Sequence, residues 1–292
     1  MSQFLQCASG FTGDGWTCPD CGFAPSVDRG IPIFAPELAH DISGYESAPF
    51  EVHGGDDAER SFWTAARSSL IVWALRAYAP QARRFLEIGC GTGGVLRRIE
   101  AAFPTMECTG AEALVLGLHK AATRLSRTRL LQFDAIRIPF QSEFDAVGAF
   151  DVIEHIVDDD GVLQSMASSL GPGGIMLLTV PQHPWLFGPA DVAAHHERRY
   201  TRAGLVDQVE RLGLRTVCVT SFVALLLPAL AAVRLLSEWR GGRYDSSEEF
   251  QIGALNGAFA RVMDVERASI RWGMRWPLGG SLLVVAQKAA RG

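Results

Sequence analysis

The sequence has no surplus of basic residues, and its first residues do not show the pattern expected of a secretion signal. Its 27 Lys and Arg residues are outnumbered by 32 Asp and Glu residues, so the formal net charge is -5 at pH 7. This balance excludes the broad basic surface of proteins that bind duplex nucleic acid, and we expect no nucleic-acid partner. The first residues contain neither a basic segment nor an apolar core of signal-peptide length, so we expect a cytoplasmic protein.

Long apolar runs are also scarce. One uncharged, apolar run, residues 217–233, is slightly short for a membrane-spanning helix and is interrupted by Pro228. Two interpretations stay open for residues 217–236: a strand followed by a buried helix, or contact with a membrane surface or a lipidic substrate. The sequence shows no internal repeat, and no Ser-His-Asp or Cys-His arrangement stands out in it.

What the chain does contain is a regular alternation of short apolar runs and helical patterns. The runs that indicate buried strands cover residues 84–88, 106–112, 129–133, 144–150 and 175–180. Helical patterns separate these runs. Further strands are expected from residue 215 and at residues 281–288. Such an alternation predicts an α/β protein in which helices cover both faces of a parallel sheet.

A glycine-rich turn follows the first of these strands, in the string FLEIGCGTGG of residues 85–94. Gly89, Gly91 and Gly93 fit the pattern GxGxG, whereas Gly89, Gly91 and Gly94 fit the dinucleotide pattern GxGxxG. Either pattern indicates a loop at which a ligand approaches the backbone closely, and neither alone identifies the ligand. No clear redox substrate region accompanies the turn, which argues against a nicotinamide or flavin cofactor.

Residues 85–181 resemble the class I S-adenosylmethionine-dependent methyltransferases in several places, in the correct order. The matching strings are LEIGCGTGG, TGAEALVLGLHKAA, LLQFDA, FDAVGAFDVIEHI and LGPGGIMLLTVP. The resemblance implies an α/β fold with a seven-stranded Rossmann-like sheet, mostly parallel with an antiparallel last strand, and helices on both faces. It places this core in residues 41–221 and 281–292. We expect residues 1–40 to form a small N-terminal module and residues 222–280 a helical insertion, which either acts as a lid over the substrate site or completes the core as a helical pair.

The resemblance also implies the cofactor, S-adenosylmethionine, with S-adenosylhomocysteine as the product. Glu112 stands where the family has the acid that grips both ribose hydroxyls, a task that suits a carboxylate. Asp134 stands where the family has an acid beside the adenine amino group. Glu87 and the backbone near Gly89 and Gly91 are expected around the methionine part. The complete predicted cofactor set is Glu87, Gly89, Cys90, Gly91, Gly93, Glu112, Ala113, Asp134, Ala135, Phe150 and Asp151.

The expected reaction is methyl transfer to an oxygen or nitrogen of a small, partly apolar acceptor, such as a secondary metabolite or a lipid-linked sugar. A neutral imidazole can remove a proton from a hydroxyl or amine near neutral pH. His155 is the first candidate for this base and His196 the second, with Tyr200 at the border of the acceptor pocket. The alternative for His155 is packing beneath the cofactor.

Two alternatives stay open for the activity as a whole. One is another chemistry of the same cofactor, such as cyclisation or transfer of its aminocarboxypropyl arm. The other is a non-catalytic, cofactor-binding scaffold. The sequence predicts neither the identity of the acceptor nor an oligomeric state.

A metal ion near the candidate base is a further expectation from resemblance. Ubiquinone-pathway O-methyltransferases and small-RNA 2′-O-methyltransferases carry a similar acid-x-x-Glu-His string and a later histidine, which can bind a divalent cation. Nitrogen and oxygen ligands of this kind suit Mg, Mn or Zn. The corresponding residues here are Asp151, Glu154, His155 and His196.

The N-terminal module raises a second metal question. Cys7, Cys18 and Cys21 supply three of the four ligands that a structural zinc site needs. Either a further ligand completes a zinc site, or residues 1–40 are a degenerate zinc-ribbon-like segment that packs without metal.

Overall fold

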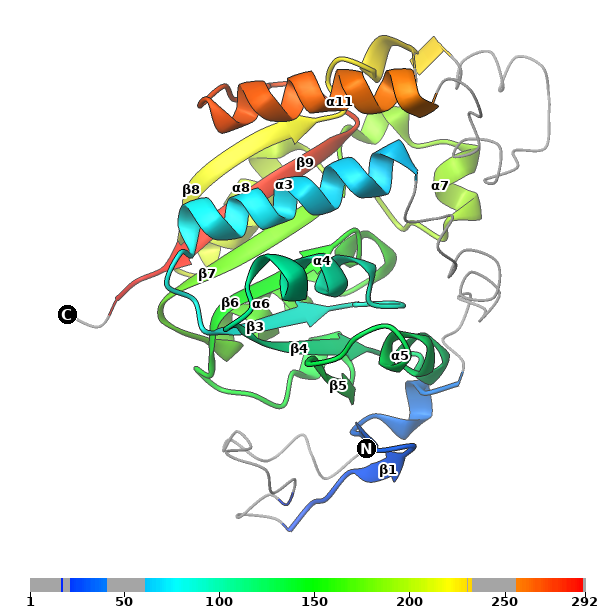
Figure 1. The fold of residues 1–292 in the computed structure, drawn as a ribbon, viewed down its shortest axis with the longest axis vertical. Helices are drawn as coiled ribbons and strands as arrows, with labels where there is room; N and C mark the ends of the chain where they lie inside the picture. The colour runs from blue at the N-terminus through cyan, green and yellow to red at the C-terminus, as the bar shows by residue number, and fades with distance from the viewer. Residues whose placement is uncertain (1–16, 18–21, 41–60, 230, 233–255, 291–292) are drawn as a thin grey trace.

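The computed structural model describes residues 17, 22–40, 61–229, 231–232 and 256–290, and these residues form a nine-stranded sheet with helices around it (Figure 1). The strands lie in the order β1-β2-β5-β4-β3-β6-β7-β9-β8. Their bounds are β1 Ser26–Asp28, β2 Ile31–Ile33, β3 Arg84–Ile88, β4 Glu107–Glu112, β5 Arg129–Gln132, β6 Phe144–Phe150, β7 Leu170–Pro181, β8 Leu214–Phe222 and β9 Ser281–Lys288.

The centre of the sheet is parallel. Strands β5, β4, β3, β6 and β7 run in one direction, and the last strand, β9, is antiparallel to its neighbours β7 and β8. This arrangement confirms the predicted α/β fold with a mostly parallel sheet and an antiparallel last strand. The strand count differs, because β1 and β2 extend the sheet from seven strands to nine.

The two additional strands form a hairpin beside β5. Arg29 and Gly30 connect them with φ angles of 49° and 85°, as a two-residue hairpin turn requires. Strand β2 then pairs in parallel with β5 through Ile33 and Gln132. Each of the two strands has three residues, too few to leave the alternating pattern from which strands are predicted.

Helices cover both faces of the sheet, as the alternation of patterns predicts. One hydrophobic cluster contains side chains of α3 (Phe62–Tyr78), α4 (Gly94–Ala102), α5 (Val115–Ala122) and α11 (Asn256–Arg271). The other contains side chains of α6 (Asp159–Ser169) and α8 (Arg202–Arg211). Figure 1 shows α3 and α11 alongside each other over the β7, β9 and β8 side of the sheet. The rings of Phe62 and Phe259, 5.5 Å apart, join these two helices.

The predicted insertion at residues 222–280 is described in part. Its helix α11 packs on α3, whereas residues 233–255 lie outside the described residues. Among the described residues, no helix is both long and apolar enough to cross a membrane. The cysteines of the predicted zinc site, Cys7, Cys18 and Cys21, also lie outside the described residues.

Candidate active site

One cavity of about 370 Å³ lies where the carboxyl ends of β3, β4, β5 and β6 meet. The loops that follow these strands form its walls, together with residues in and after α7 (Pro189–Ala193). In open α/β sheets, ligands bind at this edge. Six predicted cofactor residues line the cavity, namely Gly89, Gly91, Glu112, Ala113, Ala135 and Asp151. Five others do not line it, namely Glu87, Cys90, Gly93, Asp134 and Phe150.

The glycine turn after β3 leaves no room for side chains. Gly89, Gly91 and Gly93 have φ angles of 66°, 52° and 81°, which residues with a Cβ atom rarely adopt. A Cβ atom on Gly89 would lie 2.5 Å from Val152 Cγ2, in the loop after β6. The turn therefore needs glycine both for its backbone conformation and for its contact with the neighbouring loop.

Glu112, at the end of β4, holds this turn through its side chain. Its carboxylate accepts hydrogen bonds from the backbone N–H groups of Gly91 at 3.0 Å, Ala113 at 2.9 Å and Leu114 at 3.2 Å. Burial raises the pKa of the Glu112 carboxyl, and the three donors offset part of that rise. We call Gly89, Gly91, Glu112 and Ala113 the cofactor wall.

Glu87, on β3 just before the glycine turn, has an unmet hydrogen-bonding requirement. Its side chain is buried, and Oε2 has no hydrogen-bond partner among the described residues. Burial raises the pKa of the Glu87 carboxyl well above its ordinary value, Arg67 opposes the rise, and Glu112 adds to it. Because a buried acceptor without a donor is unfavourable, this oxygen suits a ligand that brings an N–H group.

Arg67 is a site residue that the sequence analysis missed. It lies on α3, and its guanidinium forms an ion pair with Asp151, which follows β6. Asp151 has a φ angle of 56° and also accepts a hydrogen bond from Thr179 Oγ1 at 3.2 Å. Arg67 left no signal in the sequence, because the periodicity of a helix identifies its apolar face and not the function of one polar residue.

Two predicted residues have partners away from the cavity. Asp134 accepts a hydrogen bond from Ile136 N at 3.0 Å and so caps the short 3₁₀ helix η3 (Ala135–Arg137). Tyr200 is buried and donates its hydroxyl to Asp159 Oδ2 at 2.7 Å. Burial and the neighbouring Asp159 raise the pKa of Tyr200. Their expected roles beside the adenine and the acceptor stay predictions.

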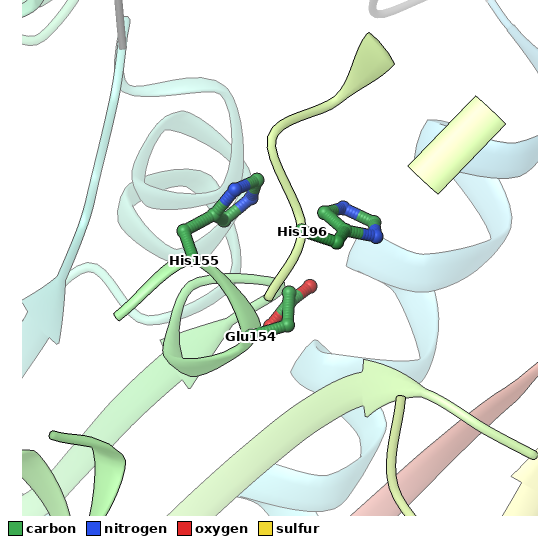
Figure 2. Close-up of side chains that lie close together, drawn as sticks. All are labelled: Glu154, His155 and His196. Atoms are coloured by element: carbon green, nitrogen blue, oxygen red, sulfur yellow. The ribbon is translucent and has the colours of Figure 1, made fainter. Parts of the chain in front are cut away.

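A second group of polar side chains, Glu154, His155 and His196, gathers at the cavity (Figure 2). We call it the histidine cluster. Glu154 and His155 belong to the 3₁₀ helix η4 (Ile153–His155) after β6, whereas His196 follows α7. One ligand atom of each residue lies within 4.8 Å of those of the others. The two rings, both of which line the cavity, meet edge to face with centroids 4.7 Å apart.

Glu154 is the most constrained member of the histidine cluster. Its side chain has 0% exposure, and neither carboxylate oxygen has a hydrogen-bond partner among the described residues. Burial raises the pKa of the Glu154 carboxyl well above its ordinary value, and the charge of Asp151 raises it further. An acid in this condition is unfavourable for folding unless a proton or a cation neutralises it.

His155 is held as a neutral ring. Burial lowers the pKa of His155 to about 4, and His196 adds to this effect. Its Nδ1 lies 3.2 Å from the backbone carbonyl of His195. A carbonyl oxygen only accepts hydrogen bonds, so we assign the ring proton to Nδ1. Nε2 of His155 is then the ring atom that carries the acceptor lone pair.

His196 is oriented by a buried aspartate. Its Nδ1 lies 2.9 Å from Asp191 Oδ1, which also accepts a hydrogen bond from Arg199 Nε at 2.8 Å. Burial would raise the pKa of Asp191, but its bonds with His196 and Arg199 outweigh burial and lower the pKa to about 2. The ionised Asp191 therefore accepts a hydrogen bond from the Nδ1–H group of His196. Nε2 is then the acceptor atom of the His196 ring.

The histidine cluster has the donor set of a divalent-metal site. It offers two imidazole nitrogens and one carboxylate, and both Nδ1 atoms are held by acceptors, as in metal-bound histidines. The unpartnered carboxylate of Glu154 fits such an ion. Asp151, the remaining residue of the predicted set, is engaged by Arg67 and Thr179. The structure thus brings together three of the four predicted ligands.

The sequence also matches known proteins. Residues 62–219 match the family model described as a methyltransferase domain. The ubiquinone biosynthesis O-methyltransferase of Xanthomonas axonopodis pv. citri (strain 306) is 27% identical over 138 residues, or 43% of this chain and 54% of that protein. The dTDP-4-amino-2,3,4,6-tetradeoxy-D-glucose N,N-dimethyltransferase of Saccharopolyspora spinosa is 29% identical over 179 residues, or 56% of this chain and 67% of that protein. The chain spans about half the length of the ubiquinone-pathway relatives that it matches.

Among solved structures, phosphoethanolamine N-methyltransferase 2 of Haemonchus contortus in complex with S-adenosyl-L-methionine has the same fold. The comparison gives a TM-score of 0.52 at 17% sequence identity and covers 85% of this chain and 60% of that chain. At this level of identity the likeness shows the fold alone.

Proposed function

The chain belongs to the methyltransferase-domain family, and from this premise we propose that it transfers a methyl group from S-adenosylmethionine to an oxygen or nitrogen of a small, partly apolar acceptor. The observation that carries the proposal is the shared cavity. The glycine turn and Glu112 lie on it together with the rings of His155 and His196. A cofactor site and a set of proton acceptors thus open into the same space, as methyl transfer requires.

The cofactor wall supplies the binding groups. When bound, S-adenosylmethionine supplies an electrophilic methyl group on a positively charged sulfur. Glu112 uses three acceptor positions on backbone donors, and a carboxylate has about four, so it can still accept from a ribose hydroxyl. Glu87 lies just before the glycine turn and does not line the cavity, so its contact with the methionine part stays a prediction from the sequence. Gly89 and Gly91 allow the close approach of that part to the backbone.

We assign the base to His196 rather than to His155, the first candidate from sequence. The pKa of His155 is about 4, which makes its ring a weak proton acceptor at neutral pH. His196 has the carboxylate of Asp191 at its Nδ1, and this charge stabilises the imidazolium that forms when Nε2 takes a proton. His155 then shapes the cavity and keeps water from the ring of His196.

A metal-assisted version is the second candidate, and the unpartnered carboxylate of Glu154 favours it. A divalent cation would be held by Glu154 and by Nε2 of His155 and His196. Its chemistry would be to lower the pKa of an acceptor hydroxyl, so that less basicity is needed from the protein. In this version His196 is a ligand and not the base, and the two versions differ in their sensitivity to chelators.

The acceptor proposed here is small and partly apolar, because apolar side chains lie beside the histidine rings. Val152, Ile156 and Val192 line this part of the cavity. A ring or alkyl portion of an acceptor would pack against them while its hydroxyl or amine faces His196. Secondary metabolites and lipid-linked sugars both meet this description.

The first test is calorimetric titration of the metal-analysed protein with S-adenosylmethionine and S-adenosylhomocysteine, with NADH as the control. We expect micromolar binding of the first two and none of NADH. Binding of NADH alone would contradict the proposal. Tight binding of S-adenosylhomocysteine without turnover of any acceptor would favour the scaffold alternative.

The second test is product analysis during turnover of an acceptor. S-adenosylhomocysteine is the by-product of methyl transfer, whereas aminocarboxypropyl transfer leaves a methylthio nucleoside, and cyclisation of an acceptor leaves the cofactor intact. Repeating the assay with a chelator separates the two catalytic versions. Unchanged turnover after metal removal supports His196 as the base, and loss that added cation restores supports the metal.

A further inference from the structure

Gln132, the last residue of β5, joins two segments that are far apart in the sequence. Its side chain has 0% exposure. Nε2 donates to the carbonyls of Ala35 and Ala113, both at 2.8 Å, and Oε1 accepts from Ala35 N at 2.9 Å. The side chain thus connects residues near the N-terminus to the cofactor wall.

On the cavity side, Ala113 is held from two directions. Its N–H donates to Glu112 Oε1 at 2.9 Å, and its carbonyl accepts from Gln132. Two residues later, Val115 N at the start of α5 donates to the carbonyl of Ala39 at 2.9 Å. The chain that carries Glu112 and Ala113 is therefore attached to the N-terminal segment at two points.

The N-terminal segment, residues 26–39, is itself fixed to the sheet. Its strand β2 pairs with β5, and Phe34 N donates to the backbone carbonyl of Gln132 at 2.8 Å. Ile33 packs in the cluster on one face of the sheet and Phe34 in the cluster on the other. Figure 1 shows this segment at the end of the sheet, next to β5 and α5. The segment is thus a firm support for the loop that it holds.

We propose that residues 26–39 position the cofactor wall and that Gln132 is the positioning residue through which they act. The inference rests on the proposed function, because it takes the cofactor to bind at Glu112 and Ala113. Gln132 does not line the cavity. Its loss frees the Ala113 peptide on the side away from Glu112 and lets the carboxylate turn out of place. Cofactor affinity then falls, while the chemical step at the histidine cluster is spared.

The test compares Gln132→Leu with Glu100→Gln. In the first variant, the affinity for S-adenosylhomocysteine falls by about tenfold, the effect of roughly one to two lost hydrogen bonds. The KM for S-adenosylmethionine rises in parallel, and kcat at saturating cofactor stays unchanged. Glu100 is the matched control, because it accepts from Arg127 N at 2.9 Å and Thr128 Oγ1 at 2.7 Å and so holds the chain just before β5, at its other end. Glu100→Gln loses stability but keeps cofactor affinity.

The outcomes separate the inference from the proposed function. Unchanged affinity in Gln132→Leu overturns the inference, and so does an equal loss in Glu100→Gln, which would mean general destabilisation. If the wild-type protein binds no S-adenosylhomocysteine, the proposed function itself fails. Binding by the wild type with no difference between the variants leaves the proposed function intact and overturns the positioning role alone.

Hydrogen exchange on the wild-type protein keeps the inference falsifiable even where Gln132→Leu does not fold. If the segment positions the wall, cofactor binding must in turn stabilise the segment, since coupling between binding and conformation is reciprocal. We expect S-adenosylhomocysteine to slow exchange at Phe34 and Ala35 more than at the amides of β8, on the opposite edge of the sheet. Equal slowing at both edges, or none at Phe34 and Ala35, overturns the inference.

Discussion

The cofactor wall and the histidine cluster each contain a glutamate out of bulk solvent, Glu112 half-buried and Glu154 fully buried, and the two carboxylates differ in their hydrogen bonds. Glu112 accepts three backbone hydrogen bonds. Glu154 has 0% exposure and accepts none through its side chain among the described residues. A buried carboxylate without donors lowers the free energy of unfolding. The cofactor wall is thus complete within the protein, whereas the histidine cluster needs a proton, a cation or a ligand to be satisfied.

This difference predicts opposite responses to substitution. On the proposed function, residues of the cofactor wall support the fold and bind the cofactor, so changing them should reduce stability and affinity together. The acid of the histidine cluster is kept at a cost to stability, as at many functional sites, so replacing it should stabilise the fold and remove activity. Substitutions in both places test this contrast, and the largest effect is expected in the glycine turn.

Gly89→Ala should weaken S-adenosylhomocysteine binding most. The positive φ angle and the 2.5 Å contact with Val152 Cγ2 both oppose a Cβ atom, so the turn must shift at the cavity, and we expect affinity to fall by about 100-fold, or roughly 3 kcal/mol. Calorimetric titration measures the loss. Gly173→Ala is the control, because Gly173 has a φ angle of 75° but a Cβ atom added there would meet nothing within 4 Å. This variant shares the backbone strain and should keep its affinity.

Glu112→Ala should reduce both properties of the cofactor wall. The change leaves three partly buried N–H groups without their acceptor, so we expect the free energy of unfolding to fall by about 1–3 kcal/mol and affinity to fall by tenfold or more. Denaturant unfolding and calorimetry measure the two effects. Glu107→Ala removes an exposed acid at the other end of β4 and should change neither. A loss of affinity without loss of stability would contradict the contrast.

Glu154→Met should have a smaller effect of the opposite sign. In chelator-treated protein, replacing an unpaired buried acid with an apolar side chain should raise the free energy of unfolding by about 1–2 kcal/mol. Turnover should fall at the same time. Glu266→Met is the matched control, since Glu266 is also buried but accepts from the backbone N–H groups of residues 223–225 at 2.6–2.9 Å. The same substitution should destabilise there, and equal effects in both variants would refute the contrast.

The smallest expected effect is on the pH dependence of the free energy of unfolding. Burial raises the pKa of Glu154 in the folded state, so the folded protein binds its proton more tightly than the unfolded chain. The contribution of the protonated Glu154 carboxyl to the free energy of unfolding is fully present below the unfolded pKa, about 4.3, and is lost as pH rises through the folded pKa. In chelator, the stability gained by Glu154→Met should therefore increase from about pH 5 upward. Denaturant unfolding of both proteins across pH measures this difference.

Glu100 is the control for that experiment, because its pKa is shifted in the opposite direction to that of Glu154. Burial would raise the pKa of Glu100, but hydrogen bonds from Thr128, Arg127 and Ser126 outweigh burial and lower it. Its contribution to stability is present above the unfolded pKa and is lost as pH falls through the folded pKa. The difference between wild type and Glu100→Gln should therefore shrink in acid. Taken as the free energy of unfolding of wild type minus that of the variant, the difference should rise with pH for Glu100→Gln and fall with pH for Glu154→Met. A value that rises with pH for Glu154→Met would contradict the raised pKa of Glu154.

The fold followed from the sequence where local patterns were long enough. Buried strands such as β3 and β6 have continuous apolar runs, and the predicted bounds at residues 84–88 and 144–150 agree with the structure. Strands β1 and β2 were missed, because three residues are too few for a pattern. Gly30 in their turn was the available sequence signal, because two-residue hairpin turns favour glycine.

The candidate site also contains some residues that the sequence predicted and others that it did not. Gly89, Gly91 and Glu112 were predicted because short strings around them are characteristic, and all three line the cavity. Arg67 and Gln132 were not, since each acts through a partner far away in the sequence. Asp151 was predicted as both a cofactor residue and a metal ligand, and its ion pair with Arg67 was not visible in its own string.

By itself, the sequence determined the order of strands and helices, the glycine turn and the types of side chain at the carboxyl edge of the sheet, because these depend on residues close together in the chain. Only the tertiary structure decided that Arg67 pairs with Asp151, that Asp191 holds the ring of His196, and that Gln132 joins Ala35 to Ala113. These contacts arise because parallel strands bring the loops after them to one edge, and no local pattern records which loops will meet there.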